Sequence, residues 1–235
     1  MRLRTFLIMV GAVLITAIYT FPIWQPLLDQ RVPIAADAVI PGLPADLAQT
    51  FAILPAEQQA AYRAVAEIDP LRGLAMVTGA LAPRQAAPDG DRDLPALINP
   101  ATLAVGSFGR IDPVRWGQGE ITIYASQSAP PLLRLDNFSV ANAPDLRIAL
   151  VVRADMLNPT PLPEGVPTPV PPPIPGTVSA LNPSSLLQVG ALKGVYGNQN
   201  FNLPANFDFT RYDRVIIYSG TLDMIYSEAA LFIRG

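Results

Sequence analysis

Leu133-Arg134-Leu135-Asp136-Asn137-Phe138 alternates apolar and polar side chains, and Glu120-Ile121-Thr122-Ile123-Tyr124 does the same a few residues earlier. Successive side chains of a β-strand point to opposite faces of the sheet. The alternation therefore predicts strands with one buried and one solvated face. Residues 146–152 are almost continuously apolar, which predicts a more buried strand.

Further short strands are expected toward the C-terminus. They cover residues 186–192, 200–203, 214–218, 222–226 and 230–233. Gly, Asn and Pro lie between them, as is typical of turns that join antiparallel strands. From residue 101 to residue 235 we therefore predict a mainly β domain with an antiparallel β-sandwich or barrel-like fold.

A proline-rich segment interrupts this pattern at residues 158–176. Nine of its nineteen residues are proline, so it has few backbone donors to offer a sheet. We predict a long irregular or polyproline II loop between two strands. A surface spacer is favoured over a ligand for a proline-binding partner.

An uncharged apolar run extends from Phe6 to Trp24 and follows Arg2 and Arg4. A helix of that length can cross a hydrocarbon core of about 30 Å, and the arginines favour a cytoplasmic N-terminus. A cleaved signal peptide is the alternative, although Thr20-Phe21-Pro22 makes a poor cleavage site. We predict a single-pass signal anchor over residues 1–28, with the C-terminal domain extracytoplasmic in the cell membrane.

Residues 29–100 are expected to form a linker that contains two short helices. The first begins near Leu54-Pro55 and reaches Ile68, with apolar residues at helical spacing. Asp69-Pro70 starts the second, with Asp69 as N-cap and Pro70 at the first helical position. That helix fades near Gly79, and residues 83–100 form a polar linker punctuated by proline.

The chain contains no His and no Cys. This excludes Cys/His zinc sites, Ser-His-Asp and Cys-His catalytic pairs, disulfides and thiol redox chemistry. Lys193 is the only lysine, and no basic stripe is present for nucleic acid. We therefore expect no enzyme activity, no metal site, no cofactor and no nucleic-acid partner.

Two loops offer polar groups for binding. Asn142-Ala143-Pro144-Asp145 is a turn sequence whose candidate ligand groups are Asn142 and Asp145. Residues 194–200 combine glycines with three amides, at Asn198, Gln199 and Asn200. Such residues also stabilise turns through their own backbone, so a purely structural role is the favoured reading for both loops. The sharper hypothesis is a contact site for a protein or a carbohydrate.

The order of short motifs in the C-terminal domain resembles a known family. The motifs are Val105-Gly106-Ser107-Phe108, Gly119-Glu120-Ile121-Thr122-Ile123, Leu133-Arg134-Leu135-Asp136-Asn137-Phe138, Asn142-Ala143-Pro144-Asp145-Leu146, Gly190-Ala191-Leu192-Lys193-Gly194, Gly197-Asn198-Gln199-Asn200-Phe201 and Val215-Ile216-Ile217-Tyr218. Together they are similar to the DM-thirteen domain, which occurs beside DOMON domains in extracellular proteins and in bacterial membrane and secreted proteins. The resemblance covers residues 101–235.

The resemblance implies a proposed electron-transfer role that rests on a cysteine directly after the strand similar to residues 215–218. This chain has Ser219 at that position. A serine hydroxyl neither cycles between redox states nor ligates a metal as a thiolate does. The departure removes the main mechanistic argument for redox chemistry in this chain.

We therefore expect a membrane-anchored, extracytoplasmic, non-catalytic binding or interaction protein of DM-thirteen type. It contacts the membrane through residues 6–24 and presents its loops to a protein or carbohydrate outside the cell. Two alternatives stay open. One is an electron-transfer accessory protein that holds a cofactor non-covalently, and the other is a structural protein of the cell envelope.

Overall fold

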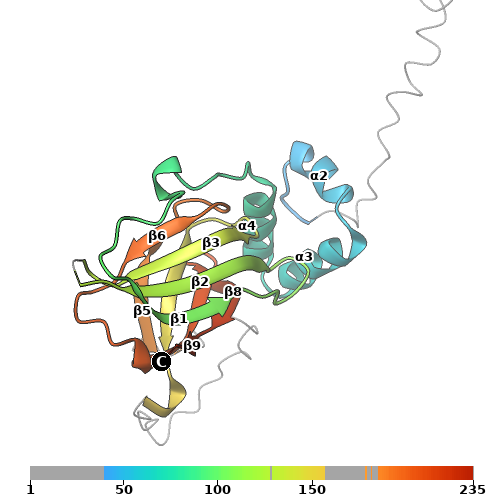
Figure 1. Ribbon diagram of the computed structural model, residues 1–235. Helices are drawn as coiled ribbons and strands as arrows, with labels where there is room; N and C mark the ends of the chain where they lie inside the picture. Colours follow the sequence, from blue (N-terminus) through green and yellow to red (C-terminus); the bar gives the residue numbers. More distant parts are fainter. Residues whose placement is uncertain (1–39, 128, 157–177, 179–180, 182–184, 235) are drawn as a thin grey trace, which may run out of the picture. The chain divides into compact units, whose positions relative to one another are not determined.

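The computed structural model describes residues 40–127, 129–156, 178, 181 and 185–234 (Figure 1). In this part of the chain, no helix is both long and apolar enough to cross a membrane. The predicted anchor at residues 1–28 and the proline-rich segment at residues 158–176 lie outside the described residues. Both therefore stay predictions.

Two antiparallel sheets form the β domain within the described residues (Figure 1). The first sheet has the strand order β6-β3-β2-β1-β9, with β1 (Ala101–Ser107), β2 (Gly117–Ala125), β3 (Leu132–Val140), β6 (Gln199–Asn202) and β9 (Phe232–Ile233). The second has the order β5-β4-β7-β8, with β4 (Leu146–Val152), β5 (Leu186–Ala191), β7 (Tyr212–Ser219) and β8 (Met224–Ala230). The prediction of a mainly β, antiparallel, sandwich-like fold is confirmed.

The core of the domain consists of aliphatic side chains at alternate strand positions. Ile121 of β2 pairs with Leu135 of β3 in the first sheet, and Ile148 of β4 pairs with Ile217 of β7 in the second. All four side chains are fully buried. Burial of one such side chain contributes about 1.5–3 kcal/mol. A register slip by one residue would expose the whole row, so these pairs fix the face that each sheet turns inward.

The second sheet also buries its other face. Ala149 and Val151 of β4 form a cluster with Ile216 of β7, and Val178 and Leu181 pack against it. Because both faces of β4 are covered, its sequence is apolar at every position except Arg147 instead of alternating.

The C-terminal strands lie at different positions from those predicted. The predicted strands at residues 222–226 and 230–233 are replaced by β8 and the short β9. Leu222 and Asp223 belong to the turn that follows β7, where Asp223 has a φ of 52°. Asp tolerates this left-handed conformation better than most residues. Leu222 is buried although it lies in a turn, which is why it resembled the start of a strand.

Helices α3 (Ala56–Ile68) and α4 (Pro70–Leu81) lie where two helices were expected. Asp69 caps α4, since its Oδ1 accepts a hydrogen bond from the Arg72 backbone N–H at 3.0 Å. Pro70 occupies the first turn, where a missing N–H costs nothing. The predicted N-cap at Asp69 and the predicted helix start at Pro70 are confirmed.

The structure adds an earlier helix, α2 (Ala45–Ala52), which the sequence reading did not include. Pro44 immediately precedes α2 and had suggested a spacer. Phe51 is almost fully buried, and α2 packs against α4. Helices this short are marginal in isolation, so tertiary packing stabilises α2.

Residues 84–93, called the strap below, were expected to be part of a polar linker. In the structure they lie along the β domain. The Val195 backbone N–H donates to the Gln85 carbonyl at 2.8 Å, and the Ala87 N–H donates to the Tyr196 carbonyl at 2.8 Å. A side chain at Gly194 would overlap the strap backbone, so glycine permits this close approach.

Candidate functional site

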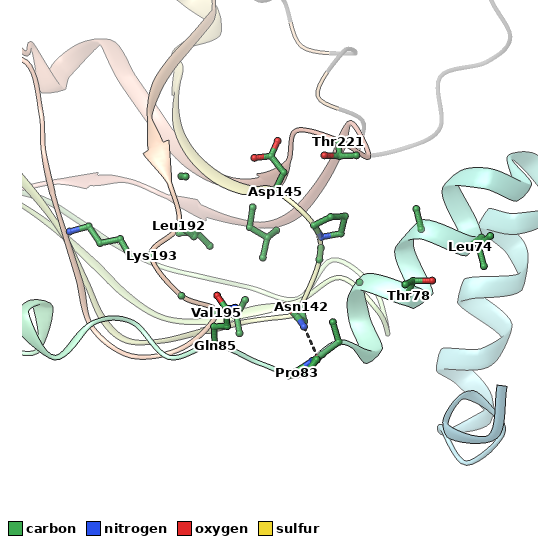
Figure 2. Close-up of a pocket in the computed structure, with 18 of the residues that line it drawn as sticks. Leu74, Thr78, Pro83, Gln85, Asn142, Asp145, Leu192, Lys193, Val195 and Thr221 are labelled. Carbon is green, nitrogen blue, oxygen red and sulfur yellow. Dashed lines mark hydrogen bonds between the residues drawn. The ribbon is translucent and has the colours of Figure 1, made fainter. Parts of the chain in front are cut away.

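A pocket of about 730 Å³ lies between α4 and two loops of the β domain, residues 142–146 and 191–195. Figure 2 shows Leu192 and Val195 on the β-domain side and Thr78 and Leu74 on α4. The walls of the pocket are mainly apolar. The two loops singled out in the sequence therefore meet at one concave surface, through the start of the second loop.

One face of α4 forms a complete wall of the pocket. Its residues follow helical spacing and are Leu71, Leu74, Ala75, Thr78, Gly79 and Ala82. The opposite face buries Met76 and Val77 completely. Helix α4 is thus apolar on two sides, of which one is buried and the other lines the pocket.

Close packing joins α4 to the loop at residues 142–146. A Cβ atom at Gly79 would lie 2.5 Å from the Pro144 Cδ, so only glycine fits there without a shift. The Asn142 Nδ2 donates to the Ala82 carbonyl at 2.9 Å, a bond drawn dashed in Figure 2. Asn142 thus satisfies a carbonyl at the C-terminal end of the helix. Its side chain thereby joins the loop at residues 142–146 to the end of α4.

Ser219, the last residue of β7, hydrogen-bonds to the same loop. Its side chain is fully buried, and its Oγ donates to the Pro144 carbonyl at 2.6 Å. The Oγ also accepts a hydrogen bond from the Leu222 backbone N–H at 3.1 Å. The neighbouring Gly220 N–H donates to the Asp145 carbonyl at 3.0 Å. Ser219 therefore ties the β7–β8 turn to the rim of the pocket and does not line the pocket itself.

Asp145 lies at the rim in a left-handed conformation, with a φ of 47°. Its two carboxylate oxygens accept hydrogen bonds from the Arg147 Nε at 3.0 and 3.1 Å. The hydrogen bond with Asp145 raises the pKa of Arg147. Asp145 is thus an ion-paired turn residue that adds a charged group to a mainly apolar pocket.

The three amides of the second loop do not line the pocket. The fully buried Gln199 side chain accepts from the Lys193 N–H at 2.9 Å and donates to the Gly194 carbonyl at 2.8 Å. Asn198 donates to the Arg92 carbonyl at 2.9 Å. All of these bonds join parts of the same chain, and those of Gln199 shape the pocket wall at residues 193–194.

Asn200 and Arg134 together hold the strap. The Asn200 Nδ2 donates to the Asp91 carbonyl at 3.2 Å and to the Asp93 carbonyl at 3.1 Å. The buried Arg134 guanidinium donates to the Asn200 Oδ1 at 3.0 Å and to the Arg92 carbonyl at 3.0 Å. Sequence reasoning missed this cluster, because the charge of Arg134 in the pattern of β3 had suggested the solvated face.

Comparison with protein families adds an independent result. A family model described as Electron transfer DM13 matches residues 111–231. The chain belongs to this family. The matched region runs from the loop before β2 through β8 and contains both pocket loops of the DM13 domain, but it does not include α2–α4. No curated protein and no solved structure matches the chain.

The family description raises the question of which redox group this DM13 chain could hold. The residues that line the pocket include no Cys, His, Met or Tyr, the side chains that ligate haem iron. In the described ranges, no group of three or more acidic, His or Cys side chains is placed to hold a metal ion. The walls of the pocket therefore do not fit an iron-ligated cofactor.

Two buried phenols lie outside the pocket. Tyr62 of α3 and Tyr226 of β8 interact electrostatically with each other and with Asp112. Burial, reinforced by the charge of Asp112, raises the pKa of Tyr62 to about 12. Burial also raises the pKa of Tyr226. Both phenols are therefore neutral at physiological pH. Their raised pKa values reflect how deeply α3 and the second sheet bury them.

Proposed function

We propose that this DM13 chain is a membrane-anchored, extracytoplasmic, non-catalytic binding protein whose pocket holds an apolar ligand. The proposal rests on the volume and the lining of the pocket. Its volume of about 730 Å³ is typical of small-molecule sites, which range from about 300 to 1,000 Å³. Its mainly apolar walls favour a ligand that gains free energy by leaving water.

A carbohydrate contact through Asn198, Gln199 and Asn200 gains no support from their geometry. Sugar recognition needs amide groups that are available to the ligand, whereas each of these side chains is bonded to the backbone of this chain. The polar side chains that line the pocket, at Thr78, Gln85, Asn142, Asp145, Lys193 and Thr221, are outnumbered by its apolar lining residues. An apolar ligand therefore suits the site better than a glycan does.

Electron transfer remains the second candidate because the family description names it. The Ser219 hydroxyl offers no redox couple, so the chain would need an organic redox molecule held non-covalently. The pocket could accept an apolar molecule of that kind. The two functions then differ in the chemistry of the ligand and not in the place where it binds.

A ligand-occupancy experiment on the full chain tests the binding role. The chain is extracted from cells that produce it, and bound small molecules are recovered in organic solvent and identified by mass spectrometry. Thr78→Trp fills the pocket from an exposed helix position, and Ala64→Trp adds the same ring on the exposed face of α3. We expect an apolar compound with the native chain and with Ala64→Trp, and a reduced amount with Thr78→Trp.

Identical extracts from all three proteins would contradict the binding role. A visible absorption band in the native protein that Thr78→Trp removes would favour electron transfer over simple binding. An unchanged extract, combined with a cell-envelope defect on deletion of the chain, would favour the structural alternative. Circular dichroism of each variant establishes that the fold is retained.

The placement outside the cytoplasm is tested by cysteine labelling, since the chain has no native thiol. We expect a membrane-impermeant maleimide to label Thr102→Cys, at an exposed position of β1, in intact cells. Thr5→Cys, directly before the apolar run at residues 6–24, should react only after lysis. The reverse labelling pattern would contradict the proposed orientation.

A further inference from the structure

We propose that the ligand of the pocket is the acyl chain of a membrane lipid, taken from the bilayer to which the protein is anchored. This inference rests on the proposed function and specifies the ligand class. Three features of the described residues support it: the length of the apolar wall, the exposed apolar mouth, and the place where the chain enters the domain.

The pocket wall on α4 extends along most of the helix. It runs from Leu71 to Ala82 along one helix face, which at about 1.5 Å per residue gives an apolar strip roughly 16 Å long. The strip offers few hydrogen-bonding groups beyond the Thr78 hydroxyl. A linear hydrocarbon chain can contact such a strip over its whole length, whereas a compact polar molecule leaves most of it uncovered.

The mouth of the pocket continues onto exposed apolar side chains. Leu71 lines the pocket and is 79% exposed, and Ile68, three residues earlier, is 67% exposed. Large apolar side chains grouped at the end of an apolar pocket are typical of surfaces that contact a lipid or another protein. These two side chains add exposed apolar surface that an acyl chain can contact.

The chain enters the domain on the same side as this wall. The backbone at Gly42 lies so close to α4 that a Cβ there would be 3.2 Å from the Leu74 Cδ2. Residues 25–39 join the predicted membrane segment to Ile40. Fifteen residues span at most about 54 Å when fully extended, which is the upper limit for the distance between Ile40 and the end of the predicted membrane segment.

Photo-cross-linking of the full chain in vesicles tests the inference. The chain is reconstituted into phosphatidylcholine vesicles that include a phosphatidylcholine with a diazirine at the end of one acyl chain. After illumination, cross-linked peptides are identified by mass spectrometry. We expect adducts on α4 and on residues 142–146, besides those on the predicted anchor at residues 6–24, which serve to normalise the yield.

Matched variants establish whether the adducts arise in the pocket. We expect the normalised yield on α4 to fall about tenfold in Thr78→Trp, equivalent to about 1.4 kcal/mol of binding free energy, and to stay unchanged in Ala64→Trp. Leu71→Glu, at the mouth, should also lower the yield. Ile53→Glu places the same charge at a site that is 83% exposed and outside the pocket, and should not.

The outcomes separate this inference from the proposed function. Adducts absent from the pocket, or equal in Thr78→Trp and the native chain, would overturn the assignment of a lipid. If a non-lipid apolar compound still co-purifies in a manner that depends on Thr78, only the lipid assignment fails. If neither lipid nor any other apolar compound depends on Thr78, both proposals fail.

Discussion

Replacement of Ser219 by alanine tests whether this residue braces the pocket. Ser219 is fully buried, donates to the Pro144 carbonyl at 2.6 Å, and accepts from the Leu222 N–H at 3.1 Å. Ser219→Ala deletes both bonds in a site that water does not reach. A buried polar group left unpaired costs about 1–3 kcal/mol. We therefore expect the free energy of unfolding to fall by about 2–4 kcal/mol.

The loss is measured by thermal unfolding of residues 40–235, which form one compact unit. Trp116 is the only tryptophan in that segment, so its fluorescence follows the domain alone. For a domain of this size, 1 kcal/mol corresponds to roughly 2–4 °C in Tm. Ser219→Ala should therefore lower the Tm by roughly 5–15 °C.

Ser227→Ala is the matched control, because Ser227 is equally buried but donates a single hydrogen bond, to the Gly109 carbonyl at 2.8 Å. Its expected loss is about half that of Ser219→Ala. If Ser219→Ala destabilises the domain no more than Ser227→Ala does, the two-bond reasoning is refuted.

Three further predictions concern other parts of the domain. Gly79→Ala should destabilise it by about 1–3 kcal/mol through overpacking against the loop, despite the higher helix propensity of alanine. Gly90→Ala, where a Cβ meets nothing within 4 Å, should be nearly neutral in the same unfolding assay. Arg134→Met should lower the free energy of unfolding by about 2–4 kcal/mol, because charge-assisted hydrogen bonds are lost. Limited proteolysis should then cut the strap first. A strap that stays resistant to the protease would argue against its anchoring by Arg134. Because the folded state raises the pKa of Tyr62 from 10.0 to about 12, the unfolded state releases its proton first, and stability should fall as the pH rises through that interval. Tyr62→Phe should flatten this decline in urea titrations, and an unchanged slope would show that Tyr62 is not responsible.

A thiol at the position of Ser219 would be shielded, which bears on the redox role that the family resemblance implies. Ser219→Cys introduces a larger atom into a fully buried site, and sulfur makes weaker hydrogen bonds than a hydroxyl. We expect Ser219→Cys to react with a water-soluble maleimide only after unfolding. Rapid labelling of the folded protein would show that the β7–β8 turn opens.

Local patterns in the sequence predicted the features that depend on neighbouring residues. Alternation predicted β2 and β3, and the almost continuous apolar run predicted the more buried β4, because strand periodicity records which faces carry apolar side chains. The Asp69-Pro70 pair predicted the start of α4, because a cap acts on the N–H groups of the next turn. The C-terminal turn was misplaced because the burial of Leu222 depends on contacts that no local pattern encodes.

The sequence by itself thus determined the fold class, the family motifs and the absence of Cys and His chemistry. Only the tertiary structure decided that α4 and residues 142–146 and 191–195 enclose one pocket, that the strap lies on the β domain, and that Ser219 is fully buried. The physical reason is that periodicity records which face of a strand or helix is buried, but not which distant segment covers it. Those partners are set by strand pairing between residues far apart in the chain, as between β4 and β7.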